Sequence, residues 1–364
     1  MSGDDKVSVS QTENVYDKPR RGKIVNHCKR FWWVHLIVCI CVIVLAVCLV
    51  IFVGVPKIAQ SKLDAADLSI DGIVVTNTQS QNFSMAINST IRTDGSVHAN
   101  IDGFVGDMYL EDLQPHTPFA SITFPATTSE ALQVVNVSQF IPIENMAAFT
   151  TFNTWLQNND SLRVTVSGNT YVHVSGISKA FPVTFIKTVT MPGLRGFNGT
   201  TVTDSAISLT PDANGDNFKG FVTIPNYSIV TFEIGNASFH NYLLGEEIGT
   251  VYVDNIVLRP GIAVNNFSMH ANISQGPVLT ALGDKPYCQN GGVIPFQLRG
   301  KTVVNHGQPL SYYADALATA NQTVELPIGG DLKALNLVIP CGGLGGSSSS
   351  SSTSSAASSS STSH

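Results

Sequence analysis

The sequence FWWVHLIVCICVIVLAVCLVIFVGV, residues 31–55, sets the architecture of the whole chain. As an α-helix these residues span about 37 Å at ~1.5 Å per residue. That length is enough to cross a bilayer hydrocarbon core of roughly 30 Å. We therefore expect a transmembrane helix over residues 31–55.

The charged residues differ on the two sides of this helix. Residues 1–56 contain seven Lys/Arg and four Asp/Glu, a net charge of +3, whereas residues 57–364 contain thirteen and 22, a net charge of −9. Basic residues stay on the cytoplasmic side of a span. The chain is therefore expected to be a type II membrane protein, with a disordered basic tail (residues 1–30) in the cytosol and the larger part in a lumen or outside the cell. The acidic balance also argues against nucleic acid as a partner.

A cleaved signal peptide is the alternative to an anchor. Its apolar region would be roughly 7–15 residues long and would be followed by a small-residue cleavage site. Residues 36–53 are apolar without interruption, and a long leader precedes them. This length favours an uncleaved anchor.

Asn-x-Ser/Thr triplets are frequent after the span and exceed the number expected from composition. N-glycosylation of such triplets is typical of a secretory compartment, although some are expected to be ordinary turn residues. The ten candidates are Asn82, Asn88, Asn136, Asn159, Asn198, Asn226, Asn236, Asn266, Asn272 and Asn321.

Cysteine use agrees with that compartment. Four cysteines lie in or beside the span, and Cys288 and Cys341 are the two beyond it. Two cysteines in an oxidising space allow one disulfide. Closing such a loop stabilises a fold by up to ~4 kcal/mol in the chain-entropy model. Two free buried thiols are the competing interpretation.

The part beyond the span is expected to be mainly β. Apolar residues alternate with polar ones in several short stretches, such as Phe83, Met85 and Ile87, which is the pattern of a half-buried strand. Turn signals at Gly168-Asn169 and at residues 212–216 separate such stretches. Many short strands over this length favour antiparallel β-sandwiches.

Two segments have helical spacing instead, namely residues 144–158 and 311–320. A faint repeat relates the strand that begins at Asn82 to one that begins at Asn217, an offset of about 135 residues, which is a plausible domain length. We expect two tandem sandwich domains, residues 60–195 and 196–341, each with a packed helix; one larger sandwich is the alternative. The Ser/Thr-rich tail, residues 342–364, is expected to be disordered.

No motif for an enzyme, a cofactor or a metal ion is found. The histidines are single and lack metal-ligand spacing. Asp212, Asn214 and Asp216 imitate the start of a calcium loop, but Asn217 stands where such a loop has glycine. A hairpin turn is the favoured interpretation, and the protein is expected not to be an enzyme.

Three segments carry a resemblance to a known family. They are residues 249–261 (GTVYVDNIVLRPG), 101–104 (IDGF) and 224–230 (IPNYSIV). They resemble segments of fungal single-pass membrane proteins of unknown function that contain domains similar to late-embryogenesis-abundant type 2 (LEA-2) β-sandwiches. Tyr227 stands where the family pattern has a second proline, which creates a sequon.

The resemblance implies a place and a function. Similar proteins include a vacuolar membrane protein that acts in autophagy termination, and LEA-2-like domains are proposed to bind lipid between sheet and helix. Phe149, Phe152 and Trp155 are candidates to line such a groove, although they are equally suited to a plain core. The first hypothesis is thus a vacuolar or endomembrane type II glycoprotein that binds lipid or a lumenal partner. The second is a plasma-membrane or wall-associated glycoprotein with a structural or adhesive role.

Overall fold

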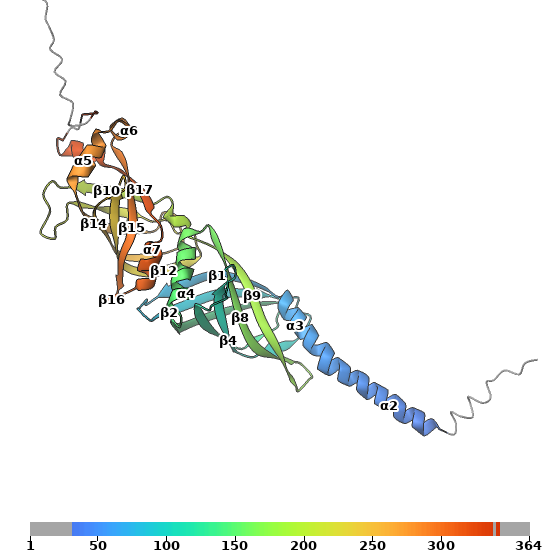
Figure 1. Cartoon of the computed structure of the whole chain (residues 1–364). Helices are drawn as coiled ribbons and strands as arrows, with labels where there is room; N and C mark the ends of the chain where they lie inside the picture. Colours follow the sequence, from blue (N-terminus) through green and yellow to red (C-terminus); the bar gives the residue numbers. More distant parts are fainter. Residues whose placement is uncertain (1–30, 338–339, 343–364) are drawn as a thin grey trace, which may run out of the picture. The chain divides into compact units, whose positions relative to one another are not determined.

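The structure is a computed structural model that describes residues 31–337 and 340–342 (Figure 1). The expected cytosolic tail, the cysteine at position 28 and residues 343–364 of the expected C-terminal tail lie outside the described residues. The chain divides into an N-terminal unit that ends at Ala59 and a second compact unit that begins at Gln60.

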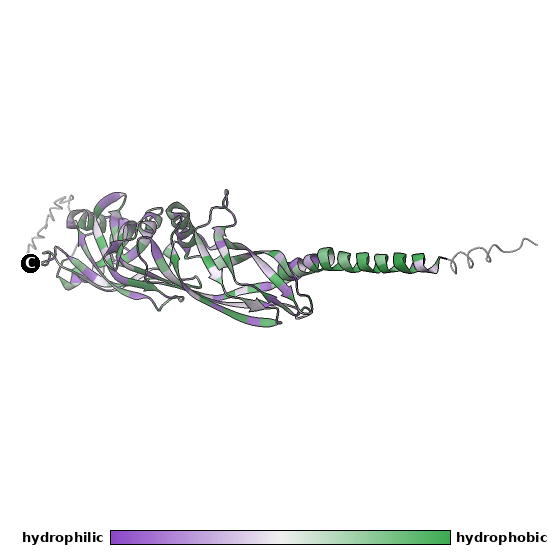
Figure 2. Cartoon of the chain, turned by 90° about the horizontal axis from the view of Figure 1, so that it is seen from below, coloured by the Kyte–Doolittle hydropathy of each residue, from purple (hydrophilic) through white to green (hydrophobic). Residues whose placement is uncertain are grey.

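The N-terminal apolar stretch is one helix of three segments. Helix α2 (Trp32–Leu49) continues into the π-helical segment η1 (Val50–Gly54) and then into α3 (Val55–Ala65). No side chain of α2 is buried, and Figure 2 shows apolar residues along its length. By length and composition this helix is a candidate membrane span.

The second unit is mainly β. Its first half, to Pro192, contains nine of the described strands and one helix. These are β1 (Asp67–Thr76), β2 (Asn82–Arg92), β3 (Ala99–Ile101), β4 (Phe104–Leu110), β5 (Ala120–Phe124), β6 (Thr127–Thr128), β7 (Leu132–Pro142), α4 (Met146–Asn158), β8 (Ser161–Val174) and β9 (Ala180–Pro192).

The second half follows a short 3-10 turn, η2 (Arg195–Phe197). Its described elements are β10 (Thr201–Ile207), β11 (Phe218–Thr223), β12 (Val230–Leu243), β13 (Glu246–Leu258), β14 (Asn266–Ile273), α5 (Gln275–Gly283), α6 (Lys285–Cys288), β15 (Val293–Asn305), β16 (Gln308–Pro309), α7 (Ser311–Leu317), β17 (Gln322–Pro327) and α8 (Ile328–Ala334).

A similar pairing pattern occurs in both halves, but β13 also pairs with β14, whereas the corresponding strands β5 and β7 lie in different sheets. In the first half β1 pairs with β2, β2 with β7, β4 with β5 and β8, and β8 with β9. In the second half β10 pairs with β11, β11 with β14, β12 with β13 and β15, and β15 with β17. Helix α4 lies between β7 and β8 in the chain, and α5 lies between the corresponding strands β14 and β15. β2 and β11, which begin at the two ends of the faint sequence repeat, therefore occupy matching places.

The expected tandem sandwiches are nevertheless not confirmed, because one sheet runs through both halves. Strand β1 pairs in parallel with β12, where Ile73 faces Val230 and Val75 faces Phe232. This pairing joins β1, β2 and β7 to the strands of the second half in a sheet of eleven described strands. The remaining six described strands form a second sheet that covers the first half only.

The apolar periodicity of the sequence agrees with the observed strand β2 and with two of the helices. On β2, Phe83, Met85 and Ile87 are buried as expected from their alternation. The predicted helices at residues 144–158 and 311–320 are observed as α4 and α7.

The predicted turn at Gly168-Asn169 is wrong. Both residues lie inside β8, where Gly168 faces Phe185 and Asn169 faces Thr184 of β9. The ring of Phe104 and the carbonyl of Val105 occupy the space that a Cβ at Gly168 would need. This glycine therefore permits close strand packing and does not mark a turn.

Candidate functional site

An apolar cavity of ≈ 60 Å³ lies between the two sheets of the first half. Its walls are formed by β1, β2 and β12 of the larger sheet, by β4, β5, β8 and β9, and by α4 and α7. At about 10–15 Å³ for each water-sized group, the space holds roughly four to six such groups. It therefore has the size of a short length of one alkyl chain.

Helix α4 places two aromatic rings in the cavity wall. The helix begins at Asn145, whose side chain accepts a hydrogen bond from the Ala148 N–H (2.9 Å) and so caps the first turn. The ring of Phe149 stacks on that of Phe83 of β2, with centroids 5.0 Å apart. The ring of Phe152 stacks on that of Phe119 at 4.2 Å. Sheet and helix are thus joined through these rings at one end of the cavity.

Two of the three predicted groove residues lie at this cavity. Phe149 and Phe152 line it, and Trp155 does not. Trp155 is half-buried and lies about 60° from Phe152 around a helix of 3.6 residues per turn, beside the side of α4 that lines the cavity. Its predicted place in the wall of this cavity is not observed.

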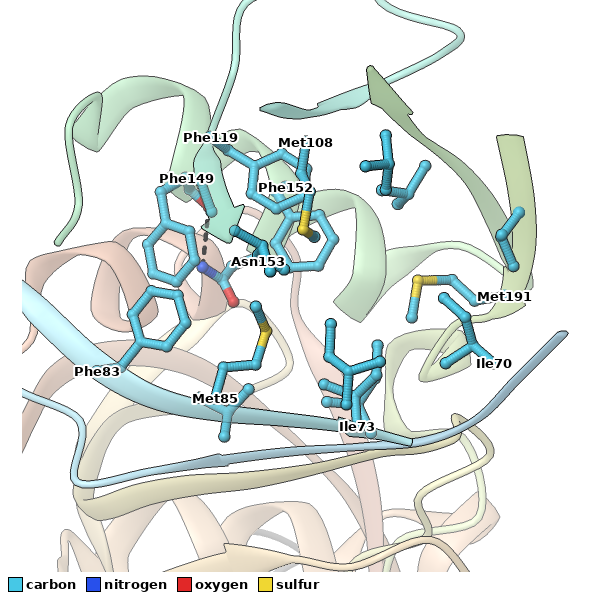
Figure 3. A pocket seen from close by; sticks show the side chains of 18 of the residues that line it. Ile70, Ile73, Phe83, Met85, Met108, Phe119, Phe149, Phe152, Asn153 and Met191 are labelled. Carbon is cyan, nitrogen blue, oxygen red and sulfur yellow. Dashed lines mark hydrogen bonds between the residues drawn. The ribbon is translucent and has the colours of Figure 1, made fainter. Parts of the chain in front are cut away.

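Sequence reasoning missed the one polar side chain of α4 that lines the cavity. Asn153 is only 5% exposed, and its Nδ2 donates to the carbonyl of Phe149 (2.8 Å). Hydrogen bonds between the described residues leave its Oδ1 free, and this atom is not fully enclosed. In Figure 3 this oxygen points toward Met85, into the cavity. An asparagine four residues after a buried phenylalanine of an amphipathic helix was the available sequence signal.

The remaining wall is apolar and adaptable. Met85, Met108 and Met191 all line the cavity (Figure 3), and their unbranched thioether chains change conformation more easily than branched side chains. Burial raises the pKa of the Tyr313 hydroxyl well above its usual value, so this lining residue stays uncharged. The Ser89 hydroxyl is already satisfied, because it donates to the carbonyl of Val135. Asn153 Oδ1 and the Tyr313 hydroxyl are therefore the side-chain polar atoms of the described wall that could contact a ligand.

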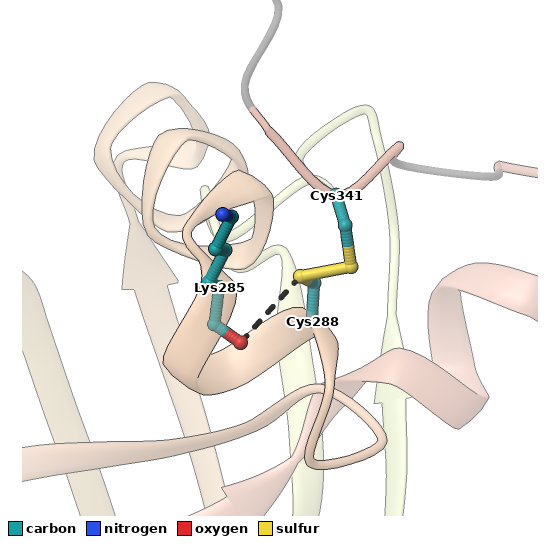
Figure 4. Close-up of a disulfide and its surroundings, with 3 residues drawn as sticks. All are labelled: Lys285, Cys288 and Cys341. Carbon is teal, nitrogen blue, oxygen red and sulfur yellow. Dashed lines mark hydrogen bonds between the residues drawn. A yellow bond between two sulfur atoms is a disulfide. The ribbon is translucent and has the colours of Figure 1, made fainter.

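The structure contains a disulfide between Cys288 of α6 and Cys341 (Figure 4). Their Cα atoms are 5.6 Å apart, and 53 residues separate them in the sequence. The bridge ties the segment after α8 to α6. A hydrogen bond from the Gly342 N–H to the carbonyl of Gly283 (2.9 Å) lies beside it.

Most of the predicted glycosylation sites are accessible. Eight asparagines are exposed and Asn82 is half-buried. The exposed eight are Asn88, Asn136, Asn159, Asn198, Asn236, Asn266, Asn272 and Asn321.

Asn226 is the exception, because it is buried in the folded chain. Its side chain is 2% exposed, and Nδ2 donates to the carbonyls of Val230 (2.8 Å) and Leu258 (3.3 Å). Its Oδ1 accepts hydrogen bonds from the backbone and the hydroxyl of Ser228. A glycan on Nδ2 would break this turn, so Asn226 has a structural role in the fold.

Polar clusters outside the cavity are explained by ordinary structure. Asp212 Oδ1 accepts from the backbone N–H groups of Asn214 and Asp216, and Oδ2 contacts Lys219 Nζ (2.7 Å), as in a closed hairpin turn. His173 lies on β8 and contacts Asp102 (3.1 Å). Within the described residues, no group of three His, Cys, Asp or Glu side chains is arranged to hold a metal ion.

Comparison with known proteins gives a family match over part of the chain. Residues 117–241, which include β5, β7, α4, β8 and most of β12, match the family described as "Protein of unknown function (DUF3712)". No curated protein matches the chain.

Solved structures show only weak likeness. A protein from Archaeoglobus fulgidus aligns with 34% of this chain and 97% of its own, at 9% identity and a TM-score of 0.22. The Salmonella enterica SafA pilin in complex with the SafB chaperone aligns with 72% of this chain and 96% of its own, at 10% identity and a TM-score of 0.18. A Mobiluncus mulieris adhesin aligns with 65% and 80%, at 9% identity and a TM-score of 0.19. Scores this low carry no argument about fold or function.

Proposed function

We propose that this protein is a non-enzymatic membrane-anchored glycoprotein whose β-rich unit binds the alkyl chain of a lipid between its two sheets. One observation carries the proposal: the cavity at α4 is apolar, and the 95% buried Asn153 turns an unpartnered oxygen into it. Because this oxygen is not fully enclosed, a hydroxyl or amide donor on a bound molecule would contribute the net energy of one hydrogen bond, about 0.5–1.5 kcal/mol.

The shape of the cavity defines the class of ligand. At ≈ 60 Å³ it takes a narrow chain more readily than a rigid ring system. The three lining methionines let it widen around a longer chain. An uncharged wall favours burial of methylene groups, at about 0.8 kcal/mol for each.

The proposal also includes the membrane orientation of the protein and the compartment of its β-rich unit. The apolar helix and the charge difference across it support a single span of type II orientation. The exposed sequons and the Cys288–Cys341 bridge support a glycosylating, oxidising compartment. The fungal resemblance supports a vacuolar or endomembrane location, and the repeated pairing pattern supports two copies of one LEA-2-like unit that share a sheet.

Photolabelling tests the lipid proposal. Full-length protein in phosphatidylcholine nanodiscs would be mixed with a panel of lipids that carry a diazirine in the alkyl chain, irradiated, deglycosylated and digested with trypsin. Labelled peptides that cover residues 63–92 and 93–163 would report the cavity, whereas the peptide of residues 31–57 reports the span. We expect labels on both cavity peptides.

Two matched variants separate cavity binding from surface labelling. Ala120 is buried in the cavity wall, so Ala120→Leu fills part of the space. Ala126 is exposed, so Ala126→Leu is the control. The cavity labels should fall in the first variant and persist in the second; no label on either cavity peptide, with any lipid of the panel, would refute lipid binding.

The orientation has a separate test. Removal of N-glycans should increase gel mobility, and protease added to sealed vesicles should leave the β-rich unit intact. Digestion of that unit would show the opposite orientation.

A further inference from the structure

The outward face of β7 combines exposed apolar side chains with a glycosylation sequon. β7 stands at one end of the strand order of the larger sheet and pairs with β2. Val134 and Phe140 point outward and are 63% and 57% exposed. Asn136 lies between them on the same face, because alternate residues of a strand share a face. Apolar surface on a terminal strand favours contact with other chains unless it is covered.

The side chains around this face leave it uncovered. The β2–β7 ladder places Thr90 and Ser84 of β2 opposite the two apolar residues. These short polar side chains shield little of the surface beside them. The backbone edge of β7 is by contrast partly closed, because Gln139 Oε1 accepts a hydrogen bond from the Thr123 N–H of β5 (3.1 Å). The part of β7 that needs a cover is therefore its outward face.

A second sequon lies directly opposite the first. Asn88 of β2 faces Asn136 of β7 in the ladder, and both are exposed. Directly opposed residues of an antiparallel pair lie on one face with Cβ atoms about 4.5–5.5 Å apart. Within the described residues neither side-chain amide takes part in a hydrogen bond, in contrast to that of Asn226. Both amides are therefore available to carry a glycan.

Glycans at this pair would extend over the apolar side chains. Val134 is two residues from Asn136, roughly 7 Å along the strand, and Phe140 is four residues away, roughly 13 Å. An N-glycan is bulky and solubilising, and its several sugar rings reach further than one strand residue. A glycan on Asn88 starts on the neighbouring strand and covers the same area.

The distribution of the sequons agrees with a glycan-bearing face. The sequon asparagines that lie in described strands all belong to the larger sheet, and the described strands of the smaller sheet contain none. Those in the larger sheet are Asn82, Asn88, Asn136, Asn236, Asn266 and Asn272.

We propose that N-glycans on the facing pair Asn88 and Asn136 cover the outward face of β7 and prevent the protein from associating with itself through Val134 and Phe140. This inference rests on the proposed glycosylation and adds a function for one pair of glycans. It does not depend on lipid binding.

Removal of the glycans after folding tests the proposal. Full-length protein from a glycosylating eukaryotic host would be placed in phosphatidylcholine nanodiscs and treated with a native N-glycosidase. The particle mass, measured by size-exclusion chromatography with light scattering, should at least double in the wild type. Val134→Thr/Phe140→Thr keeps β-branched side chains on the strand and removes most of the apolar surface. The mass of this variant should not rise after the same treatment.

Sequon variants assign the effect to the facing pair. Asn88→Gln/Asn136→Gln should associate without enzyme treatment, and adding Val134→Thr/Phe140→Thr should restore the wild-type mass. Asn159→Gln/Asn198→Gln is the matched control, because it also removes two exposed sequons, both outside the described strands. The control should keep the mass of the untreated wild type.

Glycopeptide mass spectrometry of the same samples separates the outcomes. The proposal would be overturned, while the glycoprotein proposal stands, if Asn88 and Asn136 were both unmodified and other sequons carried glycans. An unchanged wild-type mass after complete removal of the glycans, or an equal rise in Val134→Thr/Phe140→Thr, would also overturn it. The absence of glycans at every sequon would overturn both proposals.

Discussion

The ring of Phe149 on α4 meets the ring of Tyr312 on α7 nearly edge-on, with centroids 4.9 Å apart and planes inclined by 63°. This contact links a helix of the first half to a helix of the second. Tyr312 is fully buried, and its hydroxyl donates to the carbonyl of Gln79 in the β1–β2 turn (3.0 Å). The wall of the cavity therefore depends on both halves.

Truncation of this contact should destabilise the fold. Phe149→Ala removes a buried ring and should lower the free energy of unfolding by about 3–5 kcal/mol. Tyr312→Phe keeps the ring and leaves the Gln79 carbonyl without its donor, which should cost about 1 kcal/mol. Urea unfolding of the detergent-solubilised protein, followed by circular dichroism, measures both. If both variants lowered the free energy of unfolding by the same amount, the packing of the two rings would contribute no more to stability than the Tyr312 hydrogen bond.

Phe119 should control the rate of ligand exchange. Phe119→Ala removes a ring that lies in the cavity wall at the end of the β4–β5 loop and should speed the loss of a bound lipid probe. In a chase with unlabelled lipid, the cavity label after irradiation should decay faster than in the wild-type protein. Phe124→Ala also removes a cavity-lining ring but leaves Phe119 in place. An identical decay in the two variants would show that Phe119 is no gate.

The hairpin turn at Asp212 should depend on pH. Hydrogen bonds from Lys219 and from the backbone N–H groups of Asp216 and Asn214 lower the pKa of Asp212 to about 2, from 3.8. Because the folded-state pKa is the lower one, its contribution to stability is complete above pH 3.8 and is lost as the pH falls toward 2. Asp212→Asn should therefore be less stable than the wild type at pH 7, and the difference should shrink toward pH 2.

Urea unfolding at several pH values measures this difference. Asp204→Asn is the control, since Asp204 is exposed and asparagine tolerates its positive φ of 48°. If the free energy of unfolding of Asp212→Asn differed from that of the wild type by the same amount at pH 7 and at pH 2, the lowered pKa of Asp212 would be contradicted.

Asn226 should carry no glycan, and its loss should weaken the fold. Asn226→Ala removes the amide that donates to the carbonyls of Val230 and Leu258 and leaves the Ser228 hydroxyl on the Val230 carbonyl, so the expected loss is about 1–3 kcal/mol in total. Glycopeptide mass spectrometry should find Asn226 unmodified and Asn272 modified. Asn272→Ala, at an exposed position, should change the unfolding free energy by less than about 0.5 kcal/mol. A glycan on Asn226 would mean that this turn is open when the sugar is attached.

Local sequence patterns predicted the elements better than their assembly. The 3.6-residue period predicted α4, and alternation predicted β2, because each depends on neighbours along the chain. The side of α4 that faces the cavity was harder to predict. Phe152 and Trp155 both fit the apolar face, but only the contact of Phe152 with Phe119 shows which one reaches the cavity.

The features that sequence could not supply are nonlocal. Gly168 looks like a turn residue until the ring of Phe104 is placed against it. The pairing of Ile73 with Val230 has no local signal, because the two residues are far apart in the sequence and neither strand's pattern names its partner. Asn226 satisfies the sequon rule, and only its buried hydrogen bonds show that the side chain is occupied.

Because β1 pairs in parallel with β12, the larger sheet cannot be completed until the second half of the chain has been synthesised. β1 is the first strand after the apolar helix, yet its partner residue Val230 is synthesised 157 residues after Ile73 (230 minus 73). At about 5–20 residues per second, the ribosome needs roughly 8–30 s to produce that partner. During this interval one edge of β1 has its amide and carbonyl groups unpaired, and unpaired edges invite aggregation. The nascent chain should therefore depend on a chaperone until the second half has been synthesised.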